Sequence, residues 1–295
     1  MPVRRFLSHL RYEKRYSAHT IRAYESDLEL FFEYLERTYQ TTSIPDNHFQ
    51  IRSWIVQLID SGVTARSVNR KITTLKSFYR FLIREKVVEQ NPMLKIQSPK
   101  VPKRLPVFID EGKMTDLFDK VEFEPGFPGL RDRIILELFY GTGMRLSELV
   151  NLSETDVNFA NQTVKVLGKR NKERIIPLSG ILVASLKEYL NQKQSYMSEH
   201  GQQEPALFID NKCNKVYPKY VYRLVKRYLG NITTGDKKNP HILRHTFATH
   251  MLNNGAEINA VKEILGHSSL AATQVYTHNT VEKLKNIYKQ AHPKA

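Results

Sequence analysis

The sequence contains a single cysteine, Cys213, among its 295 residues. One thiol cannot form an intramolecular disulfide or supply a cysteine-rich metal site, and this scarcity is typical of the reducing cytoplasm. There is also no run of about 18 apolar residues, so no membrane span is predicted. The N-terminus has neither a continuous apolar core nor a small-residue cleavage site, which excludes a secretory signal. We therefore expect a cytoplasmic protein without membrane contact.

Acidic residues are the scarcer charge: 30 Asp and Glu stand against 45 Lys and Arg, giving a net charge of +15. The excess is present in both halves of the chain, so it is not a detachable basic tail. Such a balance favours a polyanionic partner, with nucleic acid as the first candidate, although some soluble proteins are basic for other reasons. No cluster of carboxylates with Mg²⁺-binding spacing is found, so we expect neither a metal nor a cofactor.

Two amphipathic helices are predicted in the first hundred residues. One spans about 17–36, and a second spans about 64–83, with Val68, Ile72 and Leu75 on its buried face. The second helix lacks acids to offset its cations, which repel one another at helical spacing. We expect its basic face to lie against DNA phosphates, the alternative being an ordinary solvated face. The predicted DNA-binding residues of this helix are Arg66, Arg70, Lys71, Lys76 and Arg80.

The segment "KIQSPKVPKRLP" has three prolines, four cations and no acid. Because proline removes backbone donors and disfavours helix before it, this segment reads as an extended linker. Its Lys100, Lys103 and Arg104 are further candidates for DNA contact. The predicted organisation is a helical domain over 1–97, a linker over 98–106 and a second domain over 107–295. A cationic tether between basic domains indicates a clamp around a duplex, or else an ordinary exposed loop.

The second domain is predicted to be mostly helical with a small antiparallel sheet. Helical patterns cover about 111–121 and 129–140 and return after Gly180. Between them, Val164 and Val166 alternate with polar neighbours, with one turn at Asn161–Gln162 and another within 169–172.

The stretch "HILRHTFATH" places three histidines and an arginine within ten residues. On a helix, His241 and Arg244 share one face, and Pro240 is typical of a helix start, where unpaired amides favour anions. A His-x3-His pair can ligate zinc, but Arg244 would repel the metal and no carboxylate lies nearby. His241 and Arg244 are therefore predicted to meet a phosphate, whereas His245 and His250 are predicted to be structural.

Three other positions are ambiguous when taken singly. Arg145 follows a glycine-flanked turn in "GTGMRLSEL" and could be a surface arginine. His267 follows Gly266 in "LGHSS". Tyr276 in "TQVYTH" is one of 15 tyrosines.

Taken together, however, these motifs and Lys169 in "VLGKRNKERIIPL" resemble the tyrosine recombinases, and among them most closely the Xer site-specific recombinases. The resemblance covers essentially the whole chain. "FLSHLRYEKRYSAHTIRAYESDLELFFEYL" is similar to the family's SAM-like core-binding domain, and "AHPKA" is similar to the Xer terminus. All six catalytic positions of the family are present in order: Arg145, Lys169, His241, Arg244, His267 and Tyr276.

The resemblance implies a mainly α-helical fold with a core-binding domain and a catalytic domain. It also implies a mechanism in which Tyr276 attacks DNA to form a 3′-phosphotyrosyl link. Arg145 and Arg244 would hold the phosphate, with Glu148 orienting Arg145. Lys169 would act as the acid and His241 as the base, and His267 would bond a phosphate oxygen. Many relatives have glycine where Arg170 stands, which bears on the mobility of Lys169.

The resemblance further implies a homo- or hetero-tetramer on double-stranded DNA with a specific site. A helix over about 281–291 would dock on a neighbouring subunit or pack on its own. Xer proteins resolve chromosome dimers before cell division and are activated by a septal DNA translocase. The alternatives are a mobile-element integrase of the same family, a type IB topoisomerase, and a DNA-binding protein that has lost catalysis.

Overall fold

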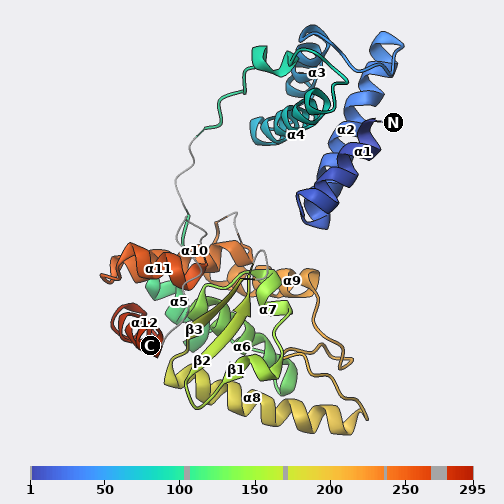
Figure 1. The fold of residues 1–295 in the computed structure, drawn as a ribbon. Coiled ribbons are helices and arrows are strands. Elements are labelled where there is room, and N and C mark those ends of the chain that lie inside the picture. The colour runs from blue at the N-terminus through green and yellow to red at the C-terminus, as the bar shows by residue number, and fades with distance from the viewer. Residues whose placement is uncertain (1, 103–106, 169–171, 236–237, 267–277, 295) are drawn as a thin grey trace. The chain divides into compact units, whose positions relative to one another are not determined.

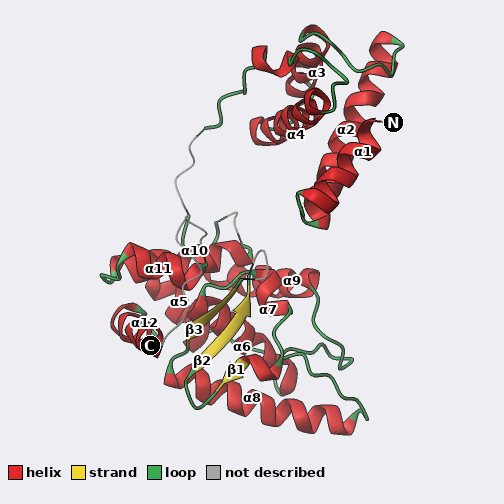
Figure 2. Cartoon of the chain, viewed as in Figure 1, coloured by secondary structure: helices red, strands yellow, loops and turns green. Residues whose placement is uncertain are grey.

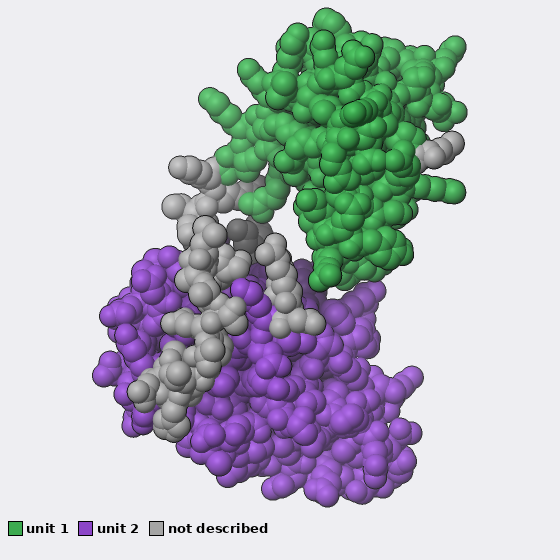
Figure 3. Space-filling view, in the orientation of Figure 1, with its two compact units in different colours: residues 1–104 green, residues 105–295 purple. Residues whose placement is uncertain are grey.

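The chain folds into two compact units, residues 1–104 and 105–295 (Figure 3). The computed structural model describes residues 2–102, 107–168, 172–235, 238–266 and 278–294, with the side chains of 278–281 left out. Each unit has its own hydrophobic core. In the described part of the chain, no helix is long and apolar enough to cross a membrane.

Over its described residues, the regular elements of the first unit are all helices (Figure 1). Its two predicted amphipathic helices are confirmed, and both begin at a capping side chain: the Ser17 hydroxyl accepts from the Thr20 amide, and the Thr64 hydroxyl accepts from the Ser67 amide. Aromatic rings such as Phe31 pack in its core. The elements are α1 (Pro2–Ser8), a π-helical turn (His9–Glu13), α2 (Ala18–Tyr39), α3 (Phe49–Asp60), α4 (Ala65–Arg84) and a 3₁₀ turn (Pro92–Lys95).

Asp27 of α2 corrects the expectation that the cations of α4 have no counter-charge. This carboxylate is 1% exposed and accepts from Lys71 at 2.9 Å, from Thr74 at 2.9 Å and from Arg70. Lys71 is itself buried, so its predicted place on a DNA-facing surface is wrong. A buried carboxylate needs such partners, and this one comes from a different helix. Arg66 and Arg80 remain exposed, as does Lys100 in the linker, whereas Lys76 is half-buried; Lys103 and Arg104 lie outside the described residues.

The second unit combines a three-stranded antiparallel sheet with helices (Figure 2), as the sequence predicts. The strand order is β1-β2-β3, with Val164 opposite Ile176 and Val166 opposite Arg174. The turn between β1 and β2 contains Gln162 at φ 50°. The strands are β1 (Val157–Asn158), β2 (Thr163–Leu167) and β3 (Glu173–Pro177).

Helix α6 lies at the centre of the second unit, where it packs against both α8 and α10. Most of its side chains are buried, which a helix enclosed on several sides requires. The helices of the unit are α5 (Glu111–Asp119), α6 (Phe127–Thr142), α7 (Leu146–Val150), a 3₁₀ turn (Glu154–Asp156), α8 (Gly180–Glu199), α9 (Pro218–Ile232), α10 (Pro240–Asn253), α11 (Ile258–Leu265) and α12 (His278–Ala291).

The last helix, α12, packs on its own unit in this structure. Leu284 and Tyr288 are buried, and α12 contacts β3, α10 and α11. Beyond it, the buried His292 stacks on Tyr288 at 4.9 Å, and its Nε2 lies 3.1 Å from the Tyr140 carbonyl oxygen. The sequence predicts this helix, while its docking on a neighbouring subunit stays a prediction.

Candidate active site

A tight turn between α6 and α7 positions Arg145. Helix α6 ends at Gly143, which has φ 60°, and a Cβ there would lie 2.5 Å from the Phe247 ring. Only glycine suits both the left-handed backbone and this close approach. Arg145 follows as the N-cap of α7, and its amide donates to Glu148 Oε2 at 2.8 Å. Its guanidinium Nη1 donates to Glu148 Oε1 at 2.7 Å, so the backbone and side chain of Arg145 are held by one carboxylate.

Helix α10 carries His241 and Arg244. The helix begins at Pro240, and the Asn239 side chain caps it by accepting from the Ile242 amide at 3.3 Å. His241 therefore lies in the first helical turn, as predicted, and it is exposed. One turn later, Arg244 is only 9% exposed.

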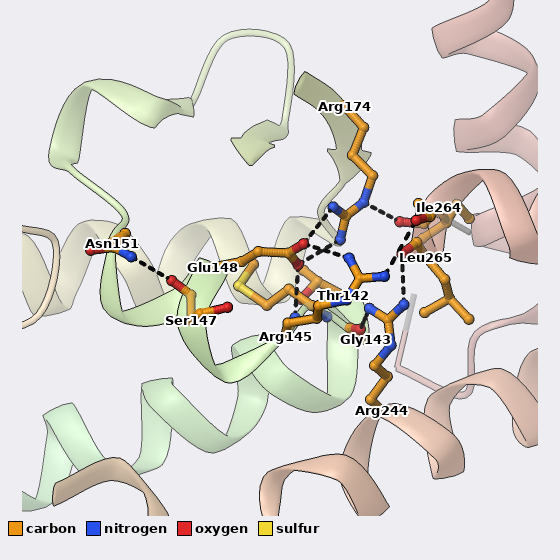
Figure 4. A network of polar contacts seen from close by, with 12 residues as sticks. Thr142, Gly143, Arg145, Ser147, Glu148, Asn151, Arg174, Arg244, Ile264 and Leu265 are labelled. Atoms are coloured by element: carbon orange, nitrogen blue, oxygen red, sulfur yellow. Dashed lines mark hydrogen bonds and ion pairs between the residues drawn. The ribbon is translucent and has the colours of Figure 1, made fainter. Parts of the chain in front are cut away.

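A third arginine, Arg174, joins the other two (Figure 4). It comes from β3, and its fork donates to both oxygens of Glu148, at 3.0 Å from Nη1 and 2.8 Å from Nη2. Figure 4 shows the guanidinium groups of the three arginines gathered around Glu148 and the end of α11. The sequence reasoning did not select Arg174. The feature that could have revealed Arg174 is its position in the strand. It is a charged residue on the buried side of an alternating pattern, opposite Val166.

The end of α11 is held by the same three arginines through three consecutive carbonyl groups. Arg174 Nε donates to the Ile264 oxygen at 2.6 Å, Arg244 Nη2 donates to the Leu265 oxygen at 2.6 Å, and Arg145 Nη2 donates to the Gly266 oxygen at 3.3 Å. The last carbonyls of a helix lack intrahelical partners and carry its negative dipole end, so cations are favoured there.

Burial and neighbouring charges shift the pKa values of Arg244 and Glu148. Desolvation by burial, with the nearby charges of Arg145 and Arg174, lowers the pKa of Arg244 to about 10. Burial by itself would raise the pKa of Glu148, but hydrogen bonds and charge from Arg174 and then Arg145 outweigh it and lower that pKa to about 2. Arg244 and Glu148 are therefore both ionised at neutral pH, and Glu148 is the carboxylate of this network.

The cluster has donors to spare for an anion. A guanidinium group has five N–H donors, and the bonds described use two of those of Arg145 and two of those of Arg244, the latter to Leu265 and to the Gly143 carbonyl at 2.6 Å. Arg145 is about a quarter exposed, with a side-chain exposure of 24%. The remaining donors suit a tetrahedral oxyanion such as a phosphate.

Three predicted catalytic residues lie outside the described residues: Lys169, His267 and Tyr276. Gly168 and Gly266, which directly precede Lys169 and His267, are described. Gly168 donates from its amide to the Lys172 carbonyl at 2.8 Å, and a Cβ on Gly168 would lie 3.6 Å from Arg174 Nη1. Gly266, which directly precedes His267, contacts the same arginine. The arginine cluster is thus adjacent to the chain positions from which Lys169 and His267 follow.

The other histidines of "HILRHTFATH" are less exposed than His241. His250 is buried and its Nδ1 lies 2.9 Å from the Tyr140 hydroxyl, and burial lowers its pKa, which fits the predicted structural role. His245 is half-buried. Over the residues that the structure describes, no group of three His, Cys, Asp or Glu side chains could hold a metal ion.

Helix α9 has a second basic face that the sequence reasoning missed. It packs against α7, and its exposed side chains include Lys219, Arg223 and Lys226. These residues recur at helical spacing opposite a buried apolar face that contains Val221 and Val225. That periodicity was the available signal.

Replacing Glu148 by glutamine should make the second unit less stable at pH 7 by at most about 3 kcal/mol, the value of a pKa lowered from near 4.5 to about 2. A lowered carboxyl pKa stabilises the fold above the unfolded pKa, and this contribution is lost as the pH falls toward 2. The difference between variant and wild type should therefore be less than half as large at pH 3. Urea unfolding followed by circular dichroism measures it.

Trp54 supplies an internal control for that experiment, because the only tryptophan of the sequence lies in the first unit. Its fluorescence transition should be the same in the wild type and in Glu148→Gln. A stability difference that does not change between pH 7 and pH 3 would assign the loss to packing and not to the charge of Glu148.

Comparison with known proteins identifies the family. Residues 108–283 match the phage integrase family, and residues 3–86 match the phage integrase N-terminal SAM-like domain. Tyrosine recombinase XerC of Chlorobaculum tepidum is 38% identical over 314 residues, covering 98% of this chain and 94% of that protein. XerC of Bacillus licheniformis is 37% identical, with 98% and 95% covered.

Solved structures share the fold. The XerH recombinase bound to its difH substrate has a TM-score of 0.68 at 23% identity, covering 91% of this chain and 79% of that one. The Tn1549 transposon integrase in complex with transposon right end DNA has a TM-score of 0.70 at 18% identity, covering 97% and 94%. Both of these curated relatives are Xer proteins, which does not favour the mobile-element alternative. The chain therefore belongs to the phage integrase family and is a site-specific tyrosine recombinase of the Xer group.

Proposed function

We propose that Tyr276 attacks a scissile phosphate of double-stranded DNA and forms a 3′-phosphotyrosyl link with release of a 5′-hydroxyl. Arg145 and Arg244 hold the non-bridging oxygens and stabilise the charge of the pentacoordinate transition state. Lys169 protonates the leaving 5′-oxygen and His241 accepts the tyrosine proton. His267 donates to a phosphate oxygen. Attack by the 5′-hydroxyl of a partner strand then reverses these steps and rejoins the DNA without ATP.

The observation that supports this proposal most is the convergence of Arg145 and Arg244 from separate helices, each with guanidinium donors that the described residues leave unused. His241 lies one turn before Arg244 on the same helix, exposed and at the amide end where anions bind. Such a cluster neutralises phosphate charge without a metal. Two of the arginines bind Glu148, and this carboxylate offsets part of their positive charge. The cluster is therefore held together in the absence of DNA.

We further propose that the protein acts as a tetramer on two specific DNA sites and resolves chromosome dimers, and that a septal DNA translocase activates it. In that assembly α12 would leave its own unit and dock on a neighbour. The sequence of α12 supports this, because Leu284 and Tyr288 make up an apolar stripe that a neighbouring unit could bury as its own unit does here. Counting protomers on a two-site complex by mass measurement tests the tetramer.

The function is tested by finding the protein's site on the host chromosome through DNA protection and placing two copies on one plasmid. We expect strand exchange, or a Holliday junction between the two copies, in a buffer that contains EDTA and no ATP. If the host has a second recombinase that the reaction needs, it is added to the assay. Relaxation of supercoils without any exchange would instead identify a topoisomerase, and would contradict the proposal.

The exposed cations of α4 should contribute to DNA affinity through phosphate contacts. We expect Arg66→Gln/Arg80→Gln to weaken binding and to reduce the slope of log K against log salt by about 2, since each phosphate contact releases roughly one counterion. Binding titrations over a range of salt measure this slope.

The matched control is Arg5→Gln/Arg84→Gln, which removes the same charge from the same unit. Both of these arginines already pair with Glu85, so their replacement should change the slope less. Equal slopes for the two double variants would contradict a DNA-contacting role for the α4 face.

A further inference from the structure

Arg174 is a buried charge to which the proposed chemistry assigns no part. It is 4% exposed and lies on β3, opposite Val166 of β2. A buried arginine costs several kcal/mol in desolvation unless its donors are satisfied. The proposed steps of cleavage do not need it to touch DNA, so its presence calls for another explanation.

The bonds of Arg174 join Glu148 of α7, which binds Arg145, to the end of α11, which binds Arg244. Two of its nitrogens bind Glu148, and that carboxylate in turn binds the backbone and side chain of Arg145. Its third nitrogen binds the Ile264 carbonyl at the end of α11. A planar fork with a third donor at its base satisfies this geometry, whereas a lysine cannot.

The packing around Arg174 is equally tight. A Cβ on Gly266 would lie 3.1 Å from both Cδ and Nη1 of Arg174, so the glycine before His267 allows the arginine to approach the backbone. Gly266 also has φ 63°, in the left-handed region. The side chain therefore lies between Glu148 on one side and Ile264 at the end of α11 on the other (Figure 4).

We propose that Arg174 is a positioning residue of the active site, which fixes Arg145 through Glu148 and fixes the end of α11 through Ile264. This inference rests on the proposed function. It assigns to Arg174 the alignment of Arg145 with the end of α11, to which Arg244 is also bonded, without contact between Arg174 and DNA. A misplacement of about 1 Å in such a group can reduce a rate about 100-fold.

The test measures single-turnover cleavage of nicked DNA by Arg174→Gln and Arg174→Lys. Both variants should cleave about 10- to 100-fold more slowly than the wild type, with unchanged DNA affinity. A second DNA carries a methyl group in place of one non-bridging oxygen of the scissile phosphate, which removes the charge that Arg145 neutralises. On that DNA the deficit of both variants should largely disappear, as should the deficit of Arg145→Ala.

Arg131→Gln is the matched control for a purely structural effect. Arg131 is also buried in the second unit, but it binds Asp132, Asn211 and the Ile209 carbonyl, outside the arginine cluster. Any loss of activity in this variant should follow its loss of folded protein, measured by urea unfolding, and should be equal on both DNAs.

Three results would overturn the assignment. A wild-type cleavage rate for Arg174→Lys would show that charge suffices without the fork. The other two are an equal rate deficit of the Arg174 variants on both DNAs, and additive losses of rate when Arg174→Lys is combined with Glu148→Gln. The last comparison applies because residues that act through one another are not additive. If the wild-type protein cleaves neither DNA, the proposed function is overturned instead. The wild-type measurement alone detects this outcome.

Discussion

Tyr276→Phe should abolish covalent linkage between the protein and DNA while leaving DNA binding intact. The substitution removes the one oxygen that can form the phosphotyrosyl bond, and no other group in the proposed site replaces it. Affinity should stay within about twofold of the wild type, because it arises mainly from many phosphate contacts with basic side chains. Denaturing gels of suicide DNA substrates measure linkage, and titration in the same buffer measures binding.

Replacement of a different tyrosine controls for general effects of the change. Tyr222 is exposed on α9, and Tyr222→Phe should form the covalent product. A covalent product from Tyr276→Phe in the same assay would mean that another residue is the nucleophile.

Arg244→Gln should reduce the rate of DNA cleavage by about 10²- to 10³-fold, the usual effect of removing one preorganised donor to a developing oxyanion. The structure adds a reason for a large effect. The guanidinium is buried and held by the Gly143 and Leu265 carbonyls at 2.6 Å each, so its free donors have a fixed direction. Single-turnover cleavage at saturating protein isolates the chemical step from binding.

Arg133→Gln is the matched control for that variant. Arg133 is also in the second unit but pairs with Glu137 along α6, so its loss should leave cleavage near the wild-type rate. A decrease of less than tenfold for Arg244→Gln, with the protein folded by circular dichroism, would contradict direct phosphate binding by Arg244.

Local patterns in the sequence predicted much of the fold. The apolar spacing corresponds to α2 and α4, and Pro240 begins α10 as expected. Helical periodicity depends on neighbours within a few residues, so the sequence displays it directly. Arg145, His241 and Arg244 were selected by motif, and the structure places the two arginines in one network.

The errors and omissions concern contacts between distant segments. Lys71 was expected on the surface because α4 has no acid of its own, but Asp27 lies 44 positions earlier in the chain. Arg174 was overlooked because its partners, Glu148 and the Ile264 carbonyl, are 26 and 90 positions away. A charged residue at an inward-facing strand position indicates a buried ion pair or hydrogen-bond network. The partners of Arg174, however, can be identified only in the folded chain.

The most direct test of the central claim is to identify the amino acid that is joined to DNA. Wild-type protein trapped on a suicide substrate is digested with protease, and the DNA-linked peptide is sequenced by mass spectrometry. We expect the peptide that contains Tyr276, joined to the phosphate at the 3′ end of the cleaved strand. A link through another residue, a link to the 5′ end, or the absence of any linked peptide would contradict it.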